Sequence, residues 1–440
     1  MMKRISLFLI AMFLLAGMVV KSQTPTVTSS AVNYSGLESK LKKSDADIQD
    51  PKKNIKAKTW TSRAQLLIDI FNIHNDIIRK GMDQNQVKIF LKEPKTVETI
   101  QEGVDNVEIY HYDRVDLKFI NGVLENWTET QKIHPDPLGE ATKAVDEAVK
   151  VNTDSKADDD IVTVIKNLKV AYETAAILDY ENKDFKSSHA NFIKLLDLNK
   201  QPLMKNIVDT VDIYYAGRAA FENKDFTEAN RLFEEAAANN YNDPFLYVFR
   251  KQSYFASGDT ASGVRVINEG FNKYPNDQSI MIELINYYLV SNQAEEALRL
   301  LGIAKANDPK NVSYTFAEGT LYEKMGRIDD AENSYKTCIE MEPEFINGIY
   351  NLAVLYYNKA VNIYEEASKI SDNAVFEKKQ QEGDEMLKKC IPYMERTTKV
   401  TAKSAEDIDT QRSALGTLKI IYYRLKMDAE YQDVVKRLNP

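Results

Sequence analysis

The residue types that most often carry chemistry are sparse in this sequence, and they do not cluster. None of the four histidines shares a metal-ligand spacing with a cysteine or a carboxylate; they stand at His74, His111, His134 and His189. We therefore interpret each histidine as a surface residue or a hydrogen-bonded polar residue rather than a metal ligand.

The acidic run Asp158–Asp160 does not continue as a calcium-binding loop, which needs alternating ligands, a central glycine and a terminal glutamate. Carboxylates are favoured at the start of a helix, because the helix dipole is positive there, so this run predicts a helix N-terminus. The chain has no G-x-S-x-G sequence and no phosphate-binding glycine loop. The sequence thus predicts a protein that is not an enzyme, with no catalytic residue, cofactor or metal.

Cys338 and Cys390 are the only two cysteines. Both fall at core positions of expected helices, which favours buried free thiols, although a disulfide between them stays open.

Composition limits the kind of partner that the chain can bind. Hydrophobic residues make up 43% and charged residues 28% of the 440 residues, which is typical of a folded protein. The net charge of −9 disfavours nucleic acid, because phosphate binding needs a basic surface.

The N-terminus carries an export signal pattern. Lys3 and Arg4 precede an apolar run from Ile5 to Val20, which is typical of a secretory signal peptide. We predict a signal peptide over residues 1–22 and a periplasmic or secreted protein, with no lipidated cysteine near the cleavage site and no transmembrane segment after cleavage. An uncleaved membrane anchor stays open as the alternative. Residues 23–57 read as a flexible linker.

A 34-residue period organises the middle of the chain. Small residues recur at this spacing at Ala229, Gly263, Ala297 and Ala331, and a second set follows seven residues later at Ala236, Gly270, Ala304 and Cys338. Small side chains let two antiparallel helices approach closely, and neighbouring aromatics fill the space beside them. Proline then ends most of the second helices, as at Pro275, Pro309 and Pro343.

This pattern resembles the tetratricopeptide repeat (TPR). The segment 321–343 carries Tyr322, Gly326, Ala331, Tyr335, Cys338 and Pro343 in the register of that family. The resemblance implies a mainly α fold, a TPR α-solenoid that forms a right-handed superhelix of helical hairpins. Four units cover roughly 207–343, and an earlier unit at 171–198 has Ser188 in a small position. The array as a whole is expected over 161–345.

The repeat at the C-terminal end looks lengthened. A first helix from residue 346 continues past its usual turn, and Cys390, Met394 and Thr397 take the small and apolar positions of the second helix. A final helical pair at 410–427 and 429–438 would cap the array, and residues 346–440 form this last region.

The first repeat, over residues 58–160, looks interrupted. Residues 58–71 read as a first helix, with Trp60, Ala64 and Leu67 in register. Its partner is expected only at 138–152, so an insert at about 81–134 would separate the two arms.

The insert reads as a helix followed by strands. Asp83 can cap a short helix that ends at Pro94, and Asn121–Gly122 between alternating apolar residues predicts a hairpin with a type I′ turn. Residues 107–112 are a candidate third strand.

The insert is similar to the small outer-membrane lipoprotein module of the barrel-assembly machinery. The matching residues are Gly81, Met82, Gln86, Val87, Leu91 and Pro94, then Tyr110, Tyr112, Phe119, Asn121, Gly122 and Val123. Lys92 replaces a glycine of that family. The resemblance implies a small α+β module that acts by binding; an unrelated helix and hairpin stay open as the alternative.

In a TPR superhelix the first helices line the concave face. Here the residues at those positions are mainly aromatic and neutral, and we predict that they bind a partner: Tyr214, Arg218, Phe221, Phe245, Gln252, Phe255, Asn286, Phe316, Tyr350 and Tyr357. Such a groove suits a segment of another cell-envelope protein or a peptide. The sequence therefore predicts a periplasmic scaffold with the insert as a second docking surface. A glycan-binding or enzyme-accessory protein of the cell envelope is the alternative.

Overall fold

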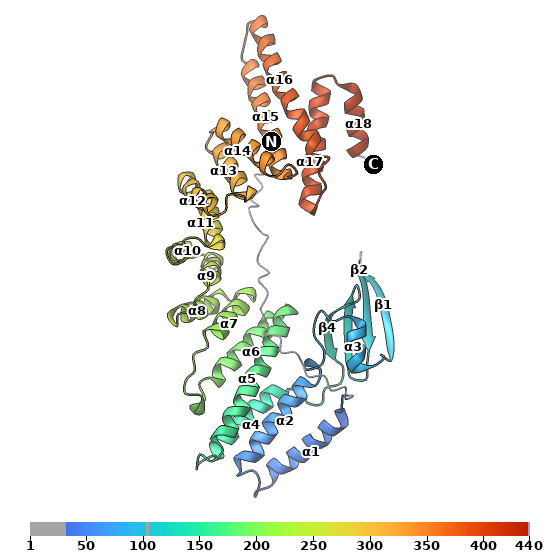
Figure 1. Cartoon of the computed structure of the whole chain (residues 1–440), viewed down its shortest axis with the longest axis vertical. Coiled ribbons are helices and arrows are strands. Elements are labelled where there is room, and N and C mark those ends of the chain that lie inside the picture. The colour runs from blue at the N-terminus through green and yellow to red at the C-terminus, as the bar shows by residue number, and fades with distance from the viewer. Residues whose placement is uncertain (1–31, 103–104, 439–440) are drawn as a thin grey trace. The chain divides into compact units, whose positions relative to one another are not determined.

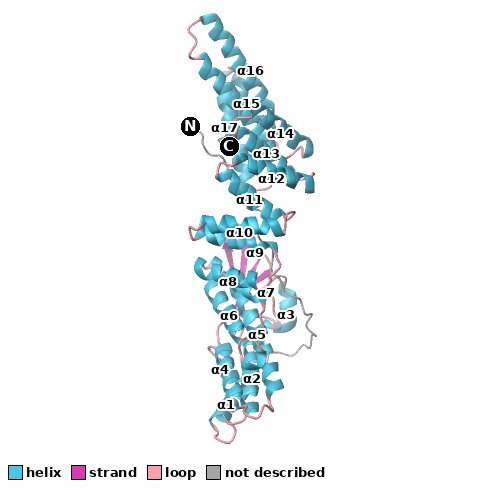
Figure 2. Cartoon of the chain, turned by 90° about the vertical axis from the view of Figure 1, so that its left-hand side faces the viewer, coloured by secondary structure: helices cyan, strands magenta, loops and turns pink. Residues whose placement is uncertain are grey.

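The structure is a computed structural model that describes residues 32–102 and 105–438 (Figure 1). Helices dominate it, and strands occur, among these residues, only between Thr96 and Glu129 (Figure 2). The predicted signal peptide lies outside the described residues. The described chain forms two compact units, residues 32–264 and 265–438, whose boundary falls within helix α10 (Thr260–Lys273).

The first helix of the described residues is α1 (Tyr34–Gln49), and the Asn33 side chain caps it by accepting a hydrogen bond from the Gly36 amide. A flexible linker was predicted over residues 23–57, but Tyr34–Gln49 form this helix; residues 23–31 lie outside the described part of the chain. Helix α1 buries only Leu41, and its ion pair from Asp45 to Arg63 of the next helix measures 2.7 Å. A mostly polar helix of this kind gives a weak apolar pattern, which is why it reads as a linker.

Helices α2 (Ala57–Asn75) and α4 (Pro137–Val151) pack against each other, although residues 76–136 separate them in sequence. Leu67 of α2 and Ala141, Val145 and Ala148 of α4 are almost completely buried in their shared core. The interrupted first repeat is therefore confirmed. We call residues 76–136 the inserted module.

The inserted module consists of α3 (Gln84–Leu91) and a four-stranded antiparallel sheet in the order β1-β2-β3-β4. The strands are β1 (Thr96–Glu102), β2 (Asp105–His111), β3 (Val115–Ile120) and β4 (Val123–Glu129). Asp83 and Gln86 form a reciprocal capping box at the start of α3. Asn121 and Gly122 have φ of 52° and 82°, the left-handed pair that a type I′ turn requires.

One face of the sheet forms the core of the module. Val87 of α3 packs there with Tyr110, Leu117, Phe119 and Leu124. These strand residues lie on the same face, because direct cross-strand neighbours share a face and positions alternate along a strand. The hairpin and the strand predicted over 107–112 are confirmed, whereas β1 was not predicted.

Paired helices follow the module. In residues 152–264 they are α5 (Asp158–Glu181), α6 (Phe185–Leu198), the 3₁₀ turn η1 (Pro202–Met204), α7 (Thr210–Glu222), α8 (Phe226–Ala238) and α9 (Pro244–Ala256). After α10 come α11 (Gln278–Val290), α12 (Ala294–Asn307), α13 (Val312–Lys324) and α14 (Ile328–Met341). The last are α15 (Ile346–Ala367), α16 (Asn373–Thr397), α17 (Ala405–Arg424) and α18 (Asp428–Leu438).

The 34-residue register positions these helices. Ala229, Ala236, Ala297, Ala304 and Ala331 are all completely buried. In the hairpins from α7–α8 to α13–α14, each turn contains one residue with positive φ, and these residues also recur every 34 residues, at Lys224, Gly258, Asn292 and Gly326. The left-handed residue ends the first helix and lets the chain reverse.

Two glycines show why the register needs small residues. A Cβ atom on Gly217 would lie 2.8 Å from the Phe233 ring, and one on Gly319 would lie 2.7 Å from the Tyr335 ring. Phe233 and Tyr335 are completely buried, so the two rings occupy the space that the missing side chains leave.

The lengthened repeat is confirmed as helices α15 and α16, which have 22 and 25 residues. A Cβ atom on Gly383 of α16 would lie 2.3 Å from the Tyr364 ring of α15, so glycine permits their close approach. The guanidinium of Arg424, from α17, lies 3.5 Å from the centre of the Tyr364 ring. Arg424 thereby joins the extended pair to the capping helices.

Both cysteines are buried free thiols, as predicted. Burial raises the pKa of both Cys338 and Cys390 to about 12. Within residues 32–438 as described, no helix combines the length and hydropathy that crossing a membrane requires.

Candidate functional site

Tyr214, one of the predicted partner-binding residues of unit 32–264, is buried. Tyr214 is 3% exposed, and its ring stacks on Tyr241 with centroids 4.6 Å apart. Burial raises the pKa of Tyr214, so its hydroxyl stays neutral. Tyr214 therefore offers almost no surface to a ligand.

Arg218 and Phe221 belong to one aromatic cluster. The Arg218 guanidinium lies 4.5 Å from the Phe249 ring centre and donates to the Tyr180 hydroxyl at 3.0 Å. Phe221 meets Phe249 edge to face at 5.8 Å. These contacts join α5, α7 and α9 and leave part of Arg218 and Phe221 exposed.

The remaining predicted residues are partly exposed. In unit 32–264 these are Phe245, Gln252 and Phe255, and in unit 265–438 they are Asn286, Phe316, Tyr350 and Tyr357. Phe316, Tyr350 and Tyr357 each pack against the core of their unit. None of these seven residues is fully exposed or fully buried, so their role in binding stays a prediction.

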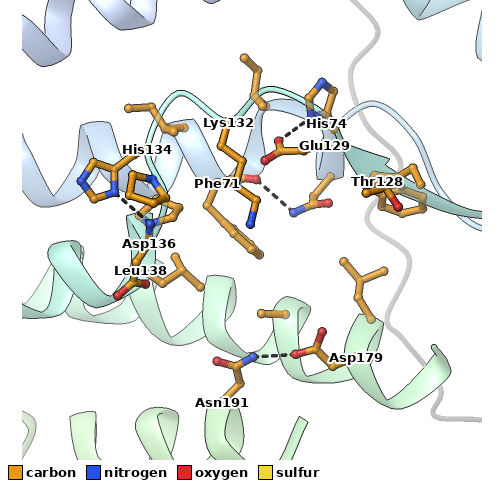
Figure 3. Close-up of a pocket in the computed structure, with 18 of the residues that line it drawn as sticks. Phe71, His74, Thr128, Glu129, Lys132, His134, Asp136, Leu138, Asp179 and Asn191 are labelled. Atoms are coloured by element: carbon orange, nitrogen blue, oxygen red, sulfur yellow. Dashed lines mark hydrogen bonds and ion pairs between the residues drawn. The ribbon is translucent and has the colours of Figure 1, made fainter. Parts of the chain in front are cut away.

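The structure contains a cleft that the sequence did not predict. It lies where the inserted module meets the first helical hairpins and has a volume of about 570 Å³. Its walls come from α1, α2, β4, the loop from β4 to α4, the start of α4, and α5 and α6. We call it the junction cleft, and Figure 3 shows many of its side chains.

His74 of α2 anchors one wall of the junction cleft. Its side chain is 2% exposed, and its Nδ1 lies 2.7 Å from Glu129 Oε1 on β4. Because a carboxylate only accepts, Nδ1 carries a proton, and Nε2 forms a hydrogen bond with the Tyr34 hydroxyl at 2.8 Å. His74 is thus a hydrogen-bonded polar residue, as predicted.

This hydrogen-bond chain ties the module to the repeat. The Arg114 guanidinium, at the start of β3, lies 4.8 Å from the Tyr34 ring centre and pairs with Glu38 of α1 at 2.7 Å. Through His74 and Tyr34, strands β3 and β4 are connected to both α1 and α2. Partly buried polar contacts therefore hold the inserted module against α1 and α2.

Asp179 of α5 lies on the facing wall (Figure 3), and Asn191 of α6 donates to its carboxylate at 2.8 Å. Burial raises the pKa of Asp179 to about 6, and the nearby charge of Asp184 acts in the same direction. The Asp179 carboxyl can therefore accept or donate a hydrogen bond to a ligand, depending on pH.

The rest of the junction cleft mixes rings with positive charge. Phe71, Trp127 and Tyr172 contribute apolar surface, and Lys132 and Lys194 contribute cations. Both lysines are exposed, and neither forms an ion pair with any residue described. No group of three or more His, Cys, Asp or Glu side chains suited to a metal occurs among the residues described.

Sequence reasoning missed the junction cleft because its walls come from segments that are far apart in the chain. The one local signal for the cleft was the interrupted repeat. The chain must leave the end of the first helix, form the insert and return to the start of the second helix, so the insert lies against the ends of these helices. Trp127 and Glu129 directly precede that re-entry.

The chain has no match among protein-family models and none among curated proteins. Among solved structures it is similar to YrrB, a TPR protein with an unusual peptide-binding site, at 15% identity over 42% of this chain and 91% of that chain, with a TM-score of 0.33. It is similar to a TPR repeats protein from Bacteroides fragilis at 18% identity, over 56% of this chain and 97% of that one, with a TM-score of 0.26.

A further similarity is to the C-terminal part of a TPR repeat-containing protein from Cytophaga hutchinsonii. The identity is 11% over 60% of this chain and 92% of that chain, and the TM-score is 0.43. Because all three scores are low, the assignment of TPR-type hairpins rests on the 34-residue register and the packing described above.

Proposed function

We propose that this chain is a non-enzymatic scaffold that binds an extended segment of another protein in the junction cleft. The observation that carries the proposal is the lining of the cleft, in which apolar rings lie beside Lys132 and Lys194, and these two lysines form no ion pair with any described residue. Rings provide contact area at low conformational cost, and free cations select acidic side chains. The preferred ligand is a peptide with acidic and apolar residues.

In this proposal, partly exposed residues on the first helices of the repeats provide further contacts within each of the two units, taken by itself. They include Phe245, Phe255, Phe316 and Tyr357. Contacts at two regions of one chain raise overall affinity without a tight contact at either region. The inserted module adds a further docking surface.

The scaffold acts in the periplasm in this proposal. The basic start at Lys3 and Arg4 and the apolar run to Val20 support export. N-terminal sequencing of the mature chain from a periplasmic fraction tests this location. A chain that keeps Met1 and stays with the membrane would contradict it.

A peptide selection tests the binding role. Peptides displayed as a random library are selected on the purified full chain, and one selected peptide is titrated by fluorescence anisotropy. We expect the double substitution Lys132→Glu and Lys194→Glu to weaken binding roughly tenfold. The matched control is Lys369→Glu with Lys389→Glu, which changes the net charge equally at exposed positions in the other unit.

Two results would contradict the proposal. One is equal binding by the cleft variant and the control variant. The other is a selection that yields no peptide at all.

Glycan binding is the second candidate function, and one observation favours it. Trp127 and Tyr172 line the junction cleft together with Asp179 and Asn191. An aromatic ring stacks on a sugar face, while carboxylate and amide groups bind hydroxyls. A glycan array separates the two functions. A glycan-binding protein gives a signal that the substitution Trp127→Ala removes, whereas a peptide scaffold gives no such signal.

A further inference from the structure

The two edges of the sheet in the inserted module differ. The edge of β4 is covered by the segment before α3, where the Gly81 amide donates to the Leu124 carbonyl and the Leu124 amide donates to the Met82 carbonyl, both at 2.8 Å. Asp83 also forms a bridge with Val123. Strand β1 is the other edge, and no described residue outside β2 pairs with it.

Strand β1 is exposed on both faces. Each of its seven residues is exposed, and none belongs to the core of the module. Figure 1 shows β1 as the outermost strand of the sheet. An exposed edge presents unpaired backbone donors and acceptors, which an extended peptide can pair with.

The side chains of β1 set the chemistry of that edge. Glu98, Ile100 and Glu102 alternate along the strand and so share the face opposite α3. Ile100 begins an apolar row that crosses all four strands through Val107, Ile120 and Val123. A strand added beside β1 extends this row if it places an apolar residue next to Ile100.

The two glutamates remain available to a partner. The Glu98 side chain is 57% exposed and lies 3.8 Å from the His111 Nε2 atom. The Glu102 side chain is 56% exposed and lies 3.7 Å from the Lys118 Nζ atom. Contacts this long and this exposed hold the carboxylates weakly, so an incoming cation can compete for them.

We propose that β1 pairs with an extended segment of a partner protein that carries a basic, an apolar and a basic residue at alternate positions. The apolar residue lies beside Ile100, and the two basic residues lie beside Glu98 and Glu102. The pattern reads the same in both directions, so it fits a parallel or an antiparallel strand. The inference specifies the docking surface of the scaffold proposed above, but it does not depend on the junction cleft.

The test uses a short synthetic peptide of the form Lys-x-Ile-x-Lys, with threonine at x, and the full chain. We expect saturable binding that weakens as salt rises, because exposed charge pairs are screened. The peptide Glu-x-Ile-x-Glu should not bind. The double substitution Glu98→Lys and Glu102→Lys should weaken binding of the basic peptide about tenfold.

The matched control is Glu340→Lys with Glu344→Lys, which changes the net charge equally at two exposed positions. The β1 variant should fold, since no β1 side chain lies in a core. Binding of the cleft-selected peptide by the β1 variant confirms that fold. If the β1 variant loses binding of the cleft-selected peptide but keeps binding of the basic peptide, the proposed function is contradicted. If the β1 variant loses binding of the basic peptide alone, the inference about β1 is supported.

Backbone pairing is tested with N-methylated peptides. Only every second amide of an added strand faces β1. Methylation of the amides that face β1 should abolish binding, whereas methylation of the amides in between should leave binding nearly unchanged. Equal effects of the two methylation patterns would overturn the proposal, as would equal binding of the acidic and basic peptides. If the chain self-associates and the basic peptide does not disrupt this association, the edge of β1 binds a second copy of the chain, and the proposal is overturned.

Discussion

Lys92 shows how a single residue can store strain at a helix end. It follows α3 with φ of 63° and ψ of −148°, a backbone region that is essentially restricted to glycine. The module therefore folds with a lysine at a position where the backbone conformation favours glycine.

We expect Lys92→Gly to stabilise the inserted module by about 1 kcal/mol, since it removes this strain. The measurement is chemical denaturation followed by tryptophan fluorescence, because Trp127 lies in β4. Lys92→Ala is the matched control, as it removes the long side chain but keeps the Cβ. A similar gain from both substitutions would contradict the strain argument.

Asp212 is a buried carboxyl on α7, 6% exposed. Burial raises its pKa to about 8, and the neighbouring Asp209 and Glu173 act in the same direction, while Lys169 opposes them. The folded state thus keeps a proton that the unfolded state releases above a pKa of 3.8. The stability contribution of Asp212 therefore falls as pH rises from about 4 to 8.

Asp212→Asn should remove that loss, because the amide stays neutral at every pH. We expect the variant to be more stable than the parent by about 1–3 kcal/mol at pH 8 and similar to it near pH 4. Thermal unfolding measured at several pH values gives the comparison. An unchanged pH slope in the variant would show that Asp212 does not carry the effect.

At the scale of the element, the hairpin of α13 and α14 contains a position with no room for a side chain. Gly319 of α13 faces Tyr335 of α14, and an added Cβ atom would lie 2.7 Å from the ring. Tyr335 is completely buried, so it has no free space into which to move. Gly319→Ala should therefore destabilise the chain by about 1–3 kcal/mol.

The control is the same substitution at Gly302 of α12. A Cβ atom there meets nothing within 4 Å, so the higher helix propensity of alanine is expected to stabilise the chain by about 0.5–1 kcal/mol. Urea denaturation of both variants measures the difference. Destabilisation of similar size at Gly302 would refute the packing explanation for Gly319.

Elements whose pattern is local were predictable from the sequence. The turn at Asn121–Gly122 and the cap at Asp83 depend on neighbouring residues alone. Strand β1 was missed because it buries no side chain and so shows no apolar alternation. Helix α1 was missed for a similar reason, since only Leu41 is buried.

At the scale of the whole molecule, the pairing of α2 with α4 was predictable because the repeat register continues across the insert. The junction cleft was not, since His74, Glu129 and Asp179 meet only through the packing of distant segments. Burial of Tyr214 was also missed: the register places it on a first helix, but not beneath Tyr241.

The inserted module is expected to be dispensable for the helical fold. The core that α1, α2, α4, α5 and α6 share includes, from residues 76–136, only the partly buried Ile133. Replacing residues 78–131 with a glycine-serine linker should keep cooperative unfolding and the helical circular dichroism signal. The melting temperature should fall by a few degrees, because His74 loses Glu129. Loss of cooperativity would contradict this independence.

The left-handed turn residues Lys224, Gly258, Asn292 and Gly326 have a consequence for how the chain can be rebuilt. Each lies at the same point in its unit and has a positive φ, between 61° and 88°, so a chain cut at one of them and rejoined at another keeps a left-handed residue at the junction. We therefore expect that one 34-residue unit can be added or removed at these residues with the turn conformation kept at the new junction.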